Sequence, residues 1–353
     1  MRLIEKYLEV FNKDLINKAN NAKLIFSNTL SNLYSHKNKK IWKTIMMYKE
    51  VISSNSIENI NTNYTKIVQW LDLPKHISSQ DIWTNTRKTV NCLISYIESK
   101  NILEAKQNID SQVLLMIQKY LDSNNKEFNN YSNDSYILKD YLTDLENFLK
   151  NPIYKNELGY IIQSCFAHFQ IISIKPFHEN NALIARLSQL LMLCYETNND
   201  IPKFSLSSFI LAHRQQYNEL LESANKSLSS INKFINFLLL ALCEACIESE
   251  NILKATDKLV VSNISKLVEL FIDYPILNSE YQEFCNLLTI SKKDVAKLLN
   301  IKDIRKLDEI IELLLSKNII QYISNEHKNK FIFTNIWNYL IELDKQLIKW
   351  QLS

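Results

Sequence analysis

The chain has 353 residues, enough to bury a large core, and this length predicts more than one domain. Its 41 basic and 38 acidic residues leave a formal charge of +3, which excludes a global field that would recruit nucleic acid or a membrane surface. Six scattered cysteines favour a reducing cytoplasm over a disulfide framework. Cys243 and Cys246 form a Cys-x-x-Cys inside an apolar helical pattern without a second pair, which favours core packing over a metal or redox site.

The first residues, Met1–Lys6, contain no apolar signal-peptide region. The longest apolar run, Phe237–Cys243, is far shorter than the roughly 20 residues needed to span a bilayer. We therefore expect a cytoplasmic protein that does not associate with a membrane. Glycine occurs once, at Gly159, against a usual share of about 7% of residues. The loss of a glycine from a motif therefore means less in this chain than in most.

Residues 1 to about 72 are predicted to be helical, because apolar side chains recur at helical spacing. The residues that form these faces are Leu3, Leu8, Phe11 and Leu15, followed by Ile41, Ile45, Met46 and Tyr48. Ser53 and Ser54 are residue types that cap the start of a helix, here one that carries Glu58. By itself, Glu58 would be a solvated carboxylate on a helix surface.

The pattern breaks at Asp72–His76. Helices are predicted next at about 80–99 and 101–122, and the polar stretch 122–134 is predicted to be a surface loop. Two further helices are predicted within 204–249.

The segment Ile174–Arg186 joins two apolar helical patterns, Tyr160–Ile172 and Ala185–Tyr195. A loop that opens a helix collects free backbone N–H groups and the positive end of the helix dipole, which suits an anion. Glu179 could hold a hydrated cation there, and Arg186 could reach a phosphate. On spacing alone, an ordinary interhelical turn is the alternative.

The C-terminal part changes character. Asp294–Ile301 and Ile304–Leu315 are predicted helices around a tight turn, while Ile319–Ile323 and Lys330–Thr334 flank a polar tip like a hairpin. This is the outline of a winged-helix-like domain. The residues that could contact DNA phosphates are Lys292, Lys293, Lys297, Lys302, Arg305 and Lys306. The acidic residues that interleave with them are Asp294, Asp303, Asp308 and Glu309. This mixture favours an interaction or dimerisation surface over a DNA-binding one.

The segment between the two central helices resembles the signature of the Fic family, His-Pro-Phe-x-Asp/Glu-Gly-Asn-Gly-Arg-x-x-Arg. The matching residues are Pro176, Phe177, Glu179, Asn181 and Arg186. The departures are Lys175 for the His, Asn180 and Ala182 for the two Gly, and Leu183 for the first Arg.

A second stretch, Ser53–Ile60, resembles the inhibitory motif Ser/Thr-x-x-x-Glu-Gly/Asn that some Fic proteins carry N-terminal to the core. The two motifs stand in the order that this class shows. Flanking stretches resemble the family as well, at Asp144–Phe148, Ala167–Gln170 and His213–Tyr217. The resemblance extends over roughly residues 15 to 320.

The resemblance implies an all-α, Fic-type helical core with a short β-hairpin flap, plus a small C-terminal winged-helix-like (α+β) domain. The corresponding divisions are 1–75 for the N-terminal helices with the inhibitory motif, 76–250 for the core and 251–353 for the C-terminal domain. The candidate flap is Lys150–Tyr154, whose edge could receive an extended target segment as a strand. A plain interhelical loop is the alternative there.

The activity implied is transfer of AMP from ATP to a hydroxyl of a protein target, with Mg²⁺ on the phosphates. By position, Lys175 replaces the catalytic His, Glu179 would hold the metal, and Asn180, Asn181 and Arg186 would bind the nucleotide. The inhibitory residue, Glu58, would pair with Arg186. We expect this pair to act mainly as a structural link between the N-terminal helices and the core.

The substitutions in the signature predict weak or absent transfer. A lysine with its ordinary pKa of about 10.4 is protonated at neutral pH and cannot accept a proton. Loss of a positioned base costs about 10²–10⁴-fold. Leu183 removes a phosphate cation, worth roughly 1.5–3 kcal/mol. Ala182 would penalise a positive φ, which Asn180 tolerates better. His178 lies outside the phosphate path that the family implies.

Three functions remain open at this point. The first is a degenerate Fic protein with weak or no AMP transfer. The second is an active transferase that Glu58 holds inhibited and in which Lys175 supports altered chemistry, as a lysine with a depressed pKa can act as a base. The third is a winged-helix DNA-binding regulator that uses the Fic core as a scaffold. A monomer and a homodimer are both compatible with the sequence.

Overall fold

The computed structural model describes residues 11–34, 36, 39–73, 83–106, 110–121, 143–148, 150, 152–196, 204–324 and 330–352. Their main helices in the N-terminal and central parts are α2 (Lys13–Tyr34), α3 (Lys39–Ile57), α4 (Tyr64–Asp72), α6 (Thr84–Lys106), α7 (Ser111–Leu121), α9 (Pro152–Ile174), α10 (Asn181–Glu196), α11 (Leu206–Ala212), α12 (Arg214–Lys226) and α13 (Leu228–Leu270). The expected helical architecture is confirmed, although the break predicted near residue 100 falls after Lys106 instead. The predicted helix before residue 11 and the predicted loop 122–134 lie outside the described residues.

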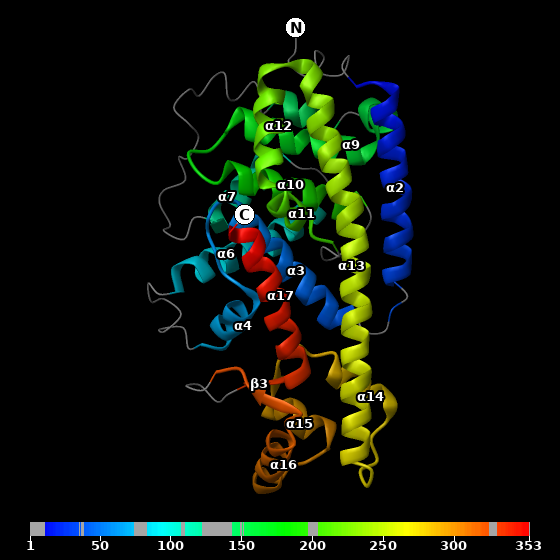
Figure 1. Cartoon of the computed structure of the whole chain (residues 1–353), viewed down its shortest axis with the longest axis vertical. Coiled ribbons are helices and arrows are strands. Elements are labelled where there is room, and N and C mark those ends of the chain that lie inside the picture. The colour runs from blue at the N-terminus through cyan, green and yellow to red at the C-terminus, as the bar shows by residue number, and fades with distance from the viewer. Residues whose placement is uncertain are drawn as a thin grey trace.

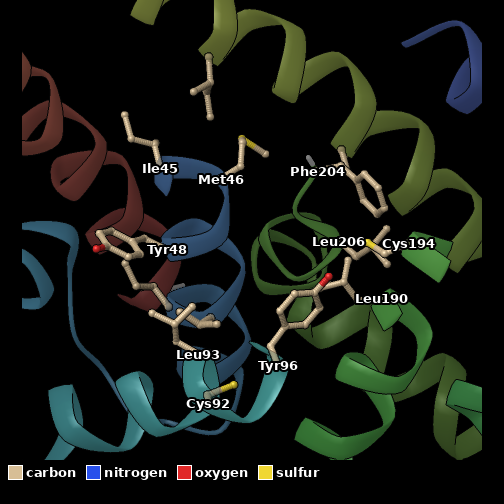
Figure 2. Close-up of a cluster of buried hydrophobic side chains, with 14 of the residues drawn as sticks. Ile45, Met46, Tyr48, Cys92, Leu93, Tyr96, Leu190, Cys194, Phe204 and Leu206 are labelled. Atoms are coloured by element: carbon tan, nitrogen blue, oxygen red, sulfur yellow. The ribbon is translucent and has the colours of Figure 1, made fainter. Parts of the chain in front are cut away.

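Helix α3 runs through the centre of the helical core. Figure 2 shows its side chains Ile45, Met46 and Tyr48 in a buried apolar cluster with residues from α6, α10 and α11. Trp42, near the start of α3, is fully buried, and its Nε1 donates a hydrogen bond of 3.1 Å to the backbone oxygen of Ser249 in α13. The core therefore fixes α3 along its length and determines where its C-terminal end lies.

Helices α9 and α10 form the buried pair that flanks the Fic-like signature. Residues 161–172 of α9 and 183–191 of α10 are all buried. The regular backbone of α9 is interrupted at Gly159, where φ is 73° and ψ is 153°. A Cβ at this position would meet nothing within 4 Å, so the positive φ and not crowding favours glycine here. Of the candidate flap Lys150–Tyr154, the part from Pro152 onward belongs to α9.

Helix α13 spans 43 residues and extends along most of the long axis of the molecule in Figure 1. The sequence predicted two helices in 204–249, whereas the structure has α11, α12 and the first half of α13 there. The predicted domain boundary after residue 250 falls inside α13. Among the described residues, α13 is the one helix long and apolar enough to cross a bilayer, but 56% of its most apolar window is buried inside the protein, as for a core helix.

The C-terminal part contains the elements α14 (Asn278–Cys285), β1 (Ile290–Ser291), α15 (Lys292–Leu298), α16 (Ile304–Ser316), β2 (Ile320–Tyr322), β3 (Lys330–Phe333) and α17 (Thr334–Leu352). The predicted helix pair and hairpin are therefore present. The strands form an antiparallel sheet of order β1-β3-β2, with Ile320 opposite Phe333. These are the strands found among the described residues. Helix α17 leaves the sheet and returns to the N-terminal helices (Figure 1).

Candidate functional site

Arg186 in α10 is held by the C-terminal end of α3. Its Nε donates to Ser54 Oγ at 2.8 Å, and its Nη2 donates to the Ser54 backbone oxygen at 2.9 Å and to Glu58 Oε1 at 2.8 Å. Only 1% of Arg186 is exposed. Burial opposes its charge, but Glu58, Tyr217 and Glu50 together outweigh this, and the pKa of Arg186 is raised above its ordinary value. The structure thus brings together two residues that lie 128 positions apart in the sequence.

The local backbone explains why Ser54 and Glu58 both reach the guanidinium. They are four residues apart, so they share one side of the helix end. Helix α3 stops at Ile57, and Asn59 adopts a φ of 61°. The Asn59 N–H donates to the Ser56 oxygen and the Ile60 N–H to the Asn55 oxygen, both at 3.0 Å, which is the Schellman pattern of a helix C-terminus.

This geometry corrects one sequence prediction. Ser53 and Ser54 lie in the last turns of α3 and do not cap the start of a helix. The side chains of Ser53 and Ser54 are both buried. Ser54 contributes to the site because its Oγ accepts a hydrogen bond from Arg186 Nε. Its role was not visible in the sequence, because the capping preference of serine suggested a different and incorrect explanation for its position.

A buried polar chain lies near Arg186. His168 is fully buried and bonds through Nδ1 to Gln189 Oε1 at 2.6 Å and through Nε2 to the Tyr217 hydroxyl at 2.8 Å. Because the amide oxygen only accepts, Nδ1 carries the proton and Nε2 accepts from Tyr217. Burial lowers the pKa of His168 to about 3 and raises the pKa of Tyr217 to about 12, so both groups are neutral. Arg186 acts electrostatically on both residues.

Glu50 is a second carboxylate near Arg186. It lies in α3 with 1% exposure, and it accepts bonds from Ser205 Oγ at 3.0 Å, from the Ser207 N–H at 3.0 Å and from Ser207 Oγ at 2.6 Å. Burial raises its pKa, while these bonds and the charge of Arg186 oppose that rise. The sequence analysis missed Glu50, since an isolated Glu in a helix gives no sign of complete burial.

The loop between α9 and α10 has two residues with positive φ, Lys175 at 50° and Asn180 at 65°. Asn181 closes the loop, because its Oδ1 accepts from the Phe177 N–H at 3.0 Å and its Nδ2 donates to the Phe177 oxygen at 2.6 Å. Asn180 Nδ2 donates to Gln118 Oε1 in α7 at 3.3 Å. Ala182 lies within α10 and has no positive φ, so the penalty expected there does not arise.

The remaining signature residues differ in exposure. Lys175, His178 and Glu179 are exposed, and among the described residues no hydrogen-bond or ionic partner of the Lys175 amine is found. Leu183 is 3% exposed and packs in the core. No group of three His, Cys, Asp or Glu side chains converges as a metal site in the part of the chain that the structure describes.

No family model matches the sequence. Among solved structures, a Fic family protein from Desulfovibrio desulfuricans G20 is similar at 15% sequence identity and a TM-score of 0.56, over 92% of this chain and 97% of that one. A fragment of Fic-1 from C. elegans is similar at 15% identity and a TM-score of 0.52, over 69% of this chain and 73% of the fragment. The chain therefore has the fold of Fic-family proteins.

Proposed function

We propose that the chain is a degenerate Fic-type protein that retains the fold and a blocked anion site but transfers AMP weakly or not at all. The observation that carries this proposal is the state of Arg186. It is almost completely buried, and three of its hydrogen bonds go to Ser54 and Glu58. A phosphate that needs this guanidinium must first displace the Glu58 carboxylate.

The position of Lys175 supports weak transfer. A base that accepts the proton of a target hydroxyl needs a pKa near neutral, which lysine reaches through burial or a neighbouring cation. Lys175 is exposed. The second expected cation is replaced by Leu183, which packs in the core and leaves no room for a charged side chain without repacking. Both departures act against the chemical step.

The residues that remain fit an anion in part. Arg186 Nη1 is a buried donor that makes no hydrogen bond within 3.5 Å among the described residues, although the guanidinium also interacts with the Tyr217 hydroxyl. Helix α10 begins at Asn181 beside the loop, with its first N–H groups directed toward the loop. Once Glu58 had withdrawn, Arg186 and this helix start would hold ATP phosphates, and the exposed Glu179 would hold Mg²⁺. In any residual transfer, a hydroxyl of the protein target would bond to the α-phosphorus of the bound ATP, pyrophosphate would leave with the Mg²⁺, and the hydroxyl proton would pass to water.

Calorimetric titration with ATP–Mg²⁺ tests the proposal. The parent is expected to bind weakly, and Glu58→Gly at least about tenfold more tightly, because a charged hydrogen bond worth roughly 1.5–3 kcal/mol no longer competes. Adding Arg186→Lys to Glu58→Gly keeps the charge but removes the planar fork, and should abolish the gain. Failure of Glu58→Gly to bind ATP would contradict the blocked anion site.

The competing function is an active transferase that Glu58 holds inhibited. Incubation with labelled ATP distinguishes it from the degenerate protein, because only an active transferase attaches the label to proteins. We expect Glu58→Gly to bind ATP without labelling itself or proteins of a lysate. Labelling that disappears in Glu58→Gly/Arg186→Lys would establish the active alternative. Comparable labelling by the unaltered parent would contradict degeneracy directly.

The winged-helix-like C-terminal part is less suited to DNA than to a protein partner. The exposed side of α16 includes Asp308, Glu309 and Glu312, which oppose the phosphate contacts that dominate DNA affinity. Lys292 is already paired with Asp308 at 2.6 Å. We expect gel shifts with duplex DNA at low salt to show no specific complex. A complex that weakens steeply with salt would favour the regulator instead.

A further inference from the structure

The C-terminal helix α17 packs against the segment that carries Glu58. Its buried residues recur at helical spacing on one face: Ile336, Leu340, Leu343, Asp344 and Leu347. This face lies mainly on α4, with further contacts to α3, α11 and α13 (Figure 1). A helix from the far end of the chain thus covers the region that follows the Glu58 turn.

Gln351, near the end of α17, forms hydrogen bonds to residues before and after the Glu58 turn. Its Nε2 donates to Ser56 Oγ at 2.9 Å and to the Thr62 backbone oxygen at 3.1 Å. Ser56 precedes Glu58 by two residues, and its backbone oxygen also accepts from the Asn59 N–H. One side-chain amide therefore links the last turn of α3 to the chain that leaves it.

Asp344 fixes the next part of the same segment. Its Oδ1 accepts from the Tyr64 N–H at 2.7 Å, and its Oδ2 accepts from Thr65 Oγ1 at 2.7 Å and the Thr65 N–H at 3.3 Å. These donors lie at the start of α4, where the backbone N–H groups have no partner within the helix. Asp344 is 6% exposed, so these bonds are shielded from water.

The other end of α17 is continuous with the C-terminal sheet. Strand β3 ends at Phe333 and the helix begins at Thr334, without an intervening loop. The Thr334 N–H donates to the Ile319 oxygen beside β2 at 3.0 Å. A shift of this sheet relative to the core must therefore move α17, unless the helix itself bends.

We propose that α17 is a positioning element that holds the Glu58 turn against Arg186, with Gln351 as its positioning residue. The C-terminal sheet thereby determines how firmly Arg186 is blocked. The effect on nucleotide binding rests on the proposed function, whereas the effect on the turn itself does not. A partner that displaces the C-terminal part would loosen Glu58.

Hydrogen exchange measured by mass spectrometry tests the positioning role without nucleotide. Gln351→Glu keeps the shape of the side chain but removes both N–H donors, and Gln351→Ala removes the whole group. The amides of Asn59 and Ile60 should exchange about five- to tenfold faster in both variants, the effect of one or two net hydrogen bonds. The matched controls are Gln346→Glu and Gln346→Ala, on the exposed side of the same helix.

Unchanged exchange at residues 58–62 in the Gln351 variants would overturn the proposal. So would equal acceleration in the Gln346 variants, or acceleration spread evenly over the chain, because each would indicate a general loss of stability.

Titration with ATP–Mg²⁺ then separates this inference from the proposed function. Gln351→Ala should bind at least about threefold more tightly than the parent and less tightly than Glu58→Gly. If Glu58→Gly binds and Gln351→Ala matches the parent, α17 does not control the block and the inference fails. If Glu58→Gly itself does not bind, the anion site fails, and the exchange experiment still decides the positioning role.

Discussion

Arg186 is 1% exposed, whereas the side chain of Glu58, whose Oε1 lies 2.8 Å from Arg186 Nη2, is 37% exposed. The two residues of this ion pair therefore differ in how well water can replace the partner when the pair is broken. Water can solvate Glu58 in place, but it cannot reach Arg186 without rearrangement of the core.

The first prediction is an unequal cost of truncation. Glu58→Ala should lower the free energy of unfolding by about 1–2 kcal/mol, because Arg186 keeps its two bonds to Ser54 and the partly exposed Glu58 gains only a screened interaction. Arg186→Ala should cost about 3–5 kcal/mol, since it removes the buried partner and leaves Ser54 unpaired. Urea unfolding of both variants measures the difference. Equal costs, or a Glu58→Ala protein as stable as the parent, would disprove the structural link.

The second prediction concerns Asn59, whose φ of 61° ends α3. Asn59→Ala should lower the free energy of unfolding by about 1–2 kcal/mol. This is the cost of a left-handed backbone conformation for a residue that has a Cβ and, unlike asparagine, no side chain that hydrogen-bonds to the nearby backbone. Asn59→Gly should cost less, because glycine adopts this φ freely. Arg214 Nη1 donates to Asn59 Oδ1 at 2.9 Å, and both variants lose this bond, so Arg214→Ala serves as the control. If Asn59→Gly unfolded at a lower temperature than Asn59→Ala, the left-handed conformation assigned to residue 59 would be contradicted.

The third prediction is that the signature cannot be repaired by restoring both its His, at Lys175, and its first Arg, at Leu183. Leu183→Arg places a charge where the parent side chain is 3% exposed, and should destabilise by several kcal/mol. Lys175→His, at an exposed position, should leave stability within about 0.5 kcal/mol of the parent. Chemical denaturation of the single variants checks both statements. Lys175→His in a Glu58→Gly background is therefore the suitable protein for assays of restored transfer. A stable Leu183→Arg chain would show that the core around the start of α10 can rearrange.

The fourth prediction is acid sensitivity from His168. Its pKa is about 3 in the folded chain and about 6.5 in an unfolded one. The unfolded state binds a proton that the folded state does not, so the contribution of this group is complete above about pH 6.5 and is lost as the pH falls toward 3. The slope is at most about 1.4 kcal/mol per pH unit. His168→Gln should flatten this dependence in urea unfolding, whereas His213→Gln, at an exposed residue, should not. Equal pH dependence of both variants would contradict the buried neutral His168.

The sequence predicted the helical architecture and both segments of the site, because periodicity and two separated motifs are local properties. It did not predict that Leu183 is buried, since a position in a helix shows its exposure only when its neighbours are known. Ser54 was misinterpreted for a similar reason. Its type suggested a helix start, but Val51, Ile52 and Ile57 are buried on either side of it, and this packing carries the helix past Ser54.

The long-range polar contacts were the least predictable features. Gln351 and Ser56 are 295 positions apart, and Asp344 and Tyr64 are 280 apart. Glutamine and aspartate on a helix are usually solvated, so their residue types carry no indication of a buried partner. Only the path of α17 across α4 reveals it.

The uninterrupted course of α13 has a consequence for how this protein can be divided. At 1.5 Å per residue its 43 residues form a rod of about 65 Å that serves both the core and the C-terminal part. Cutting the chain after residue 250 would interrupt this helix and separate Asp257 from His36, whose Nδ1 lies 3.1 Å from the Asp257 Oδ2. We therefore expect that proteolysis releases no stable C-terminal fragment that starts near residue 251. Replacing the C-terminal part by that of a relative should succeed only when the whole of α13 is transferred with it.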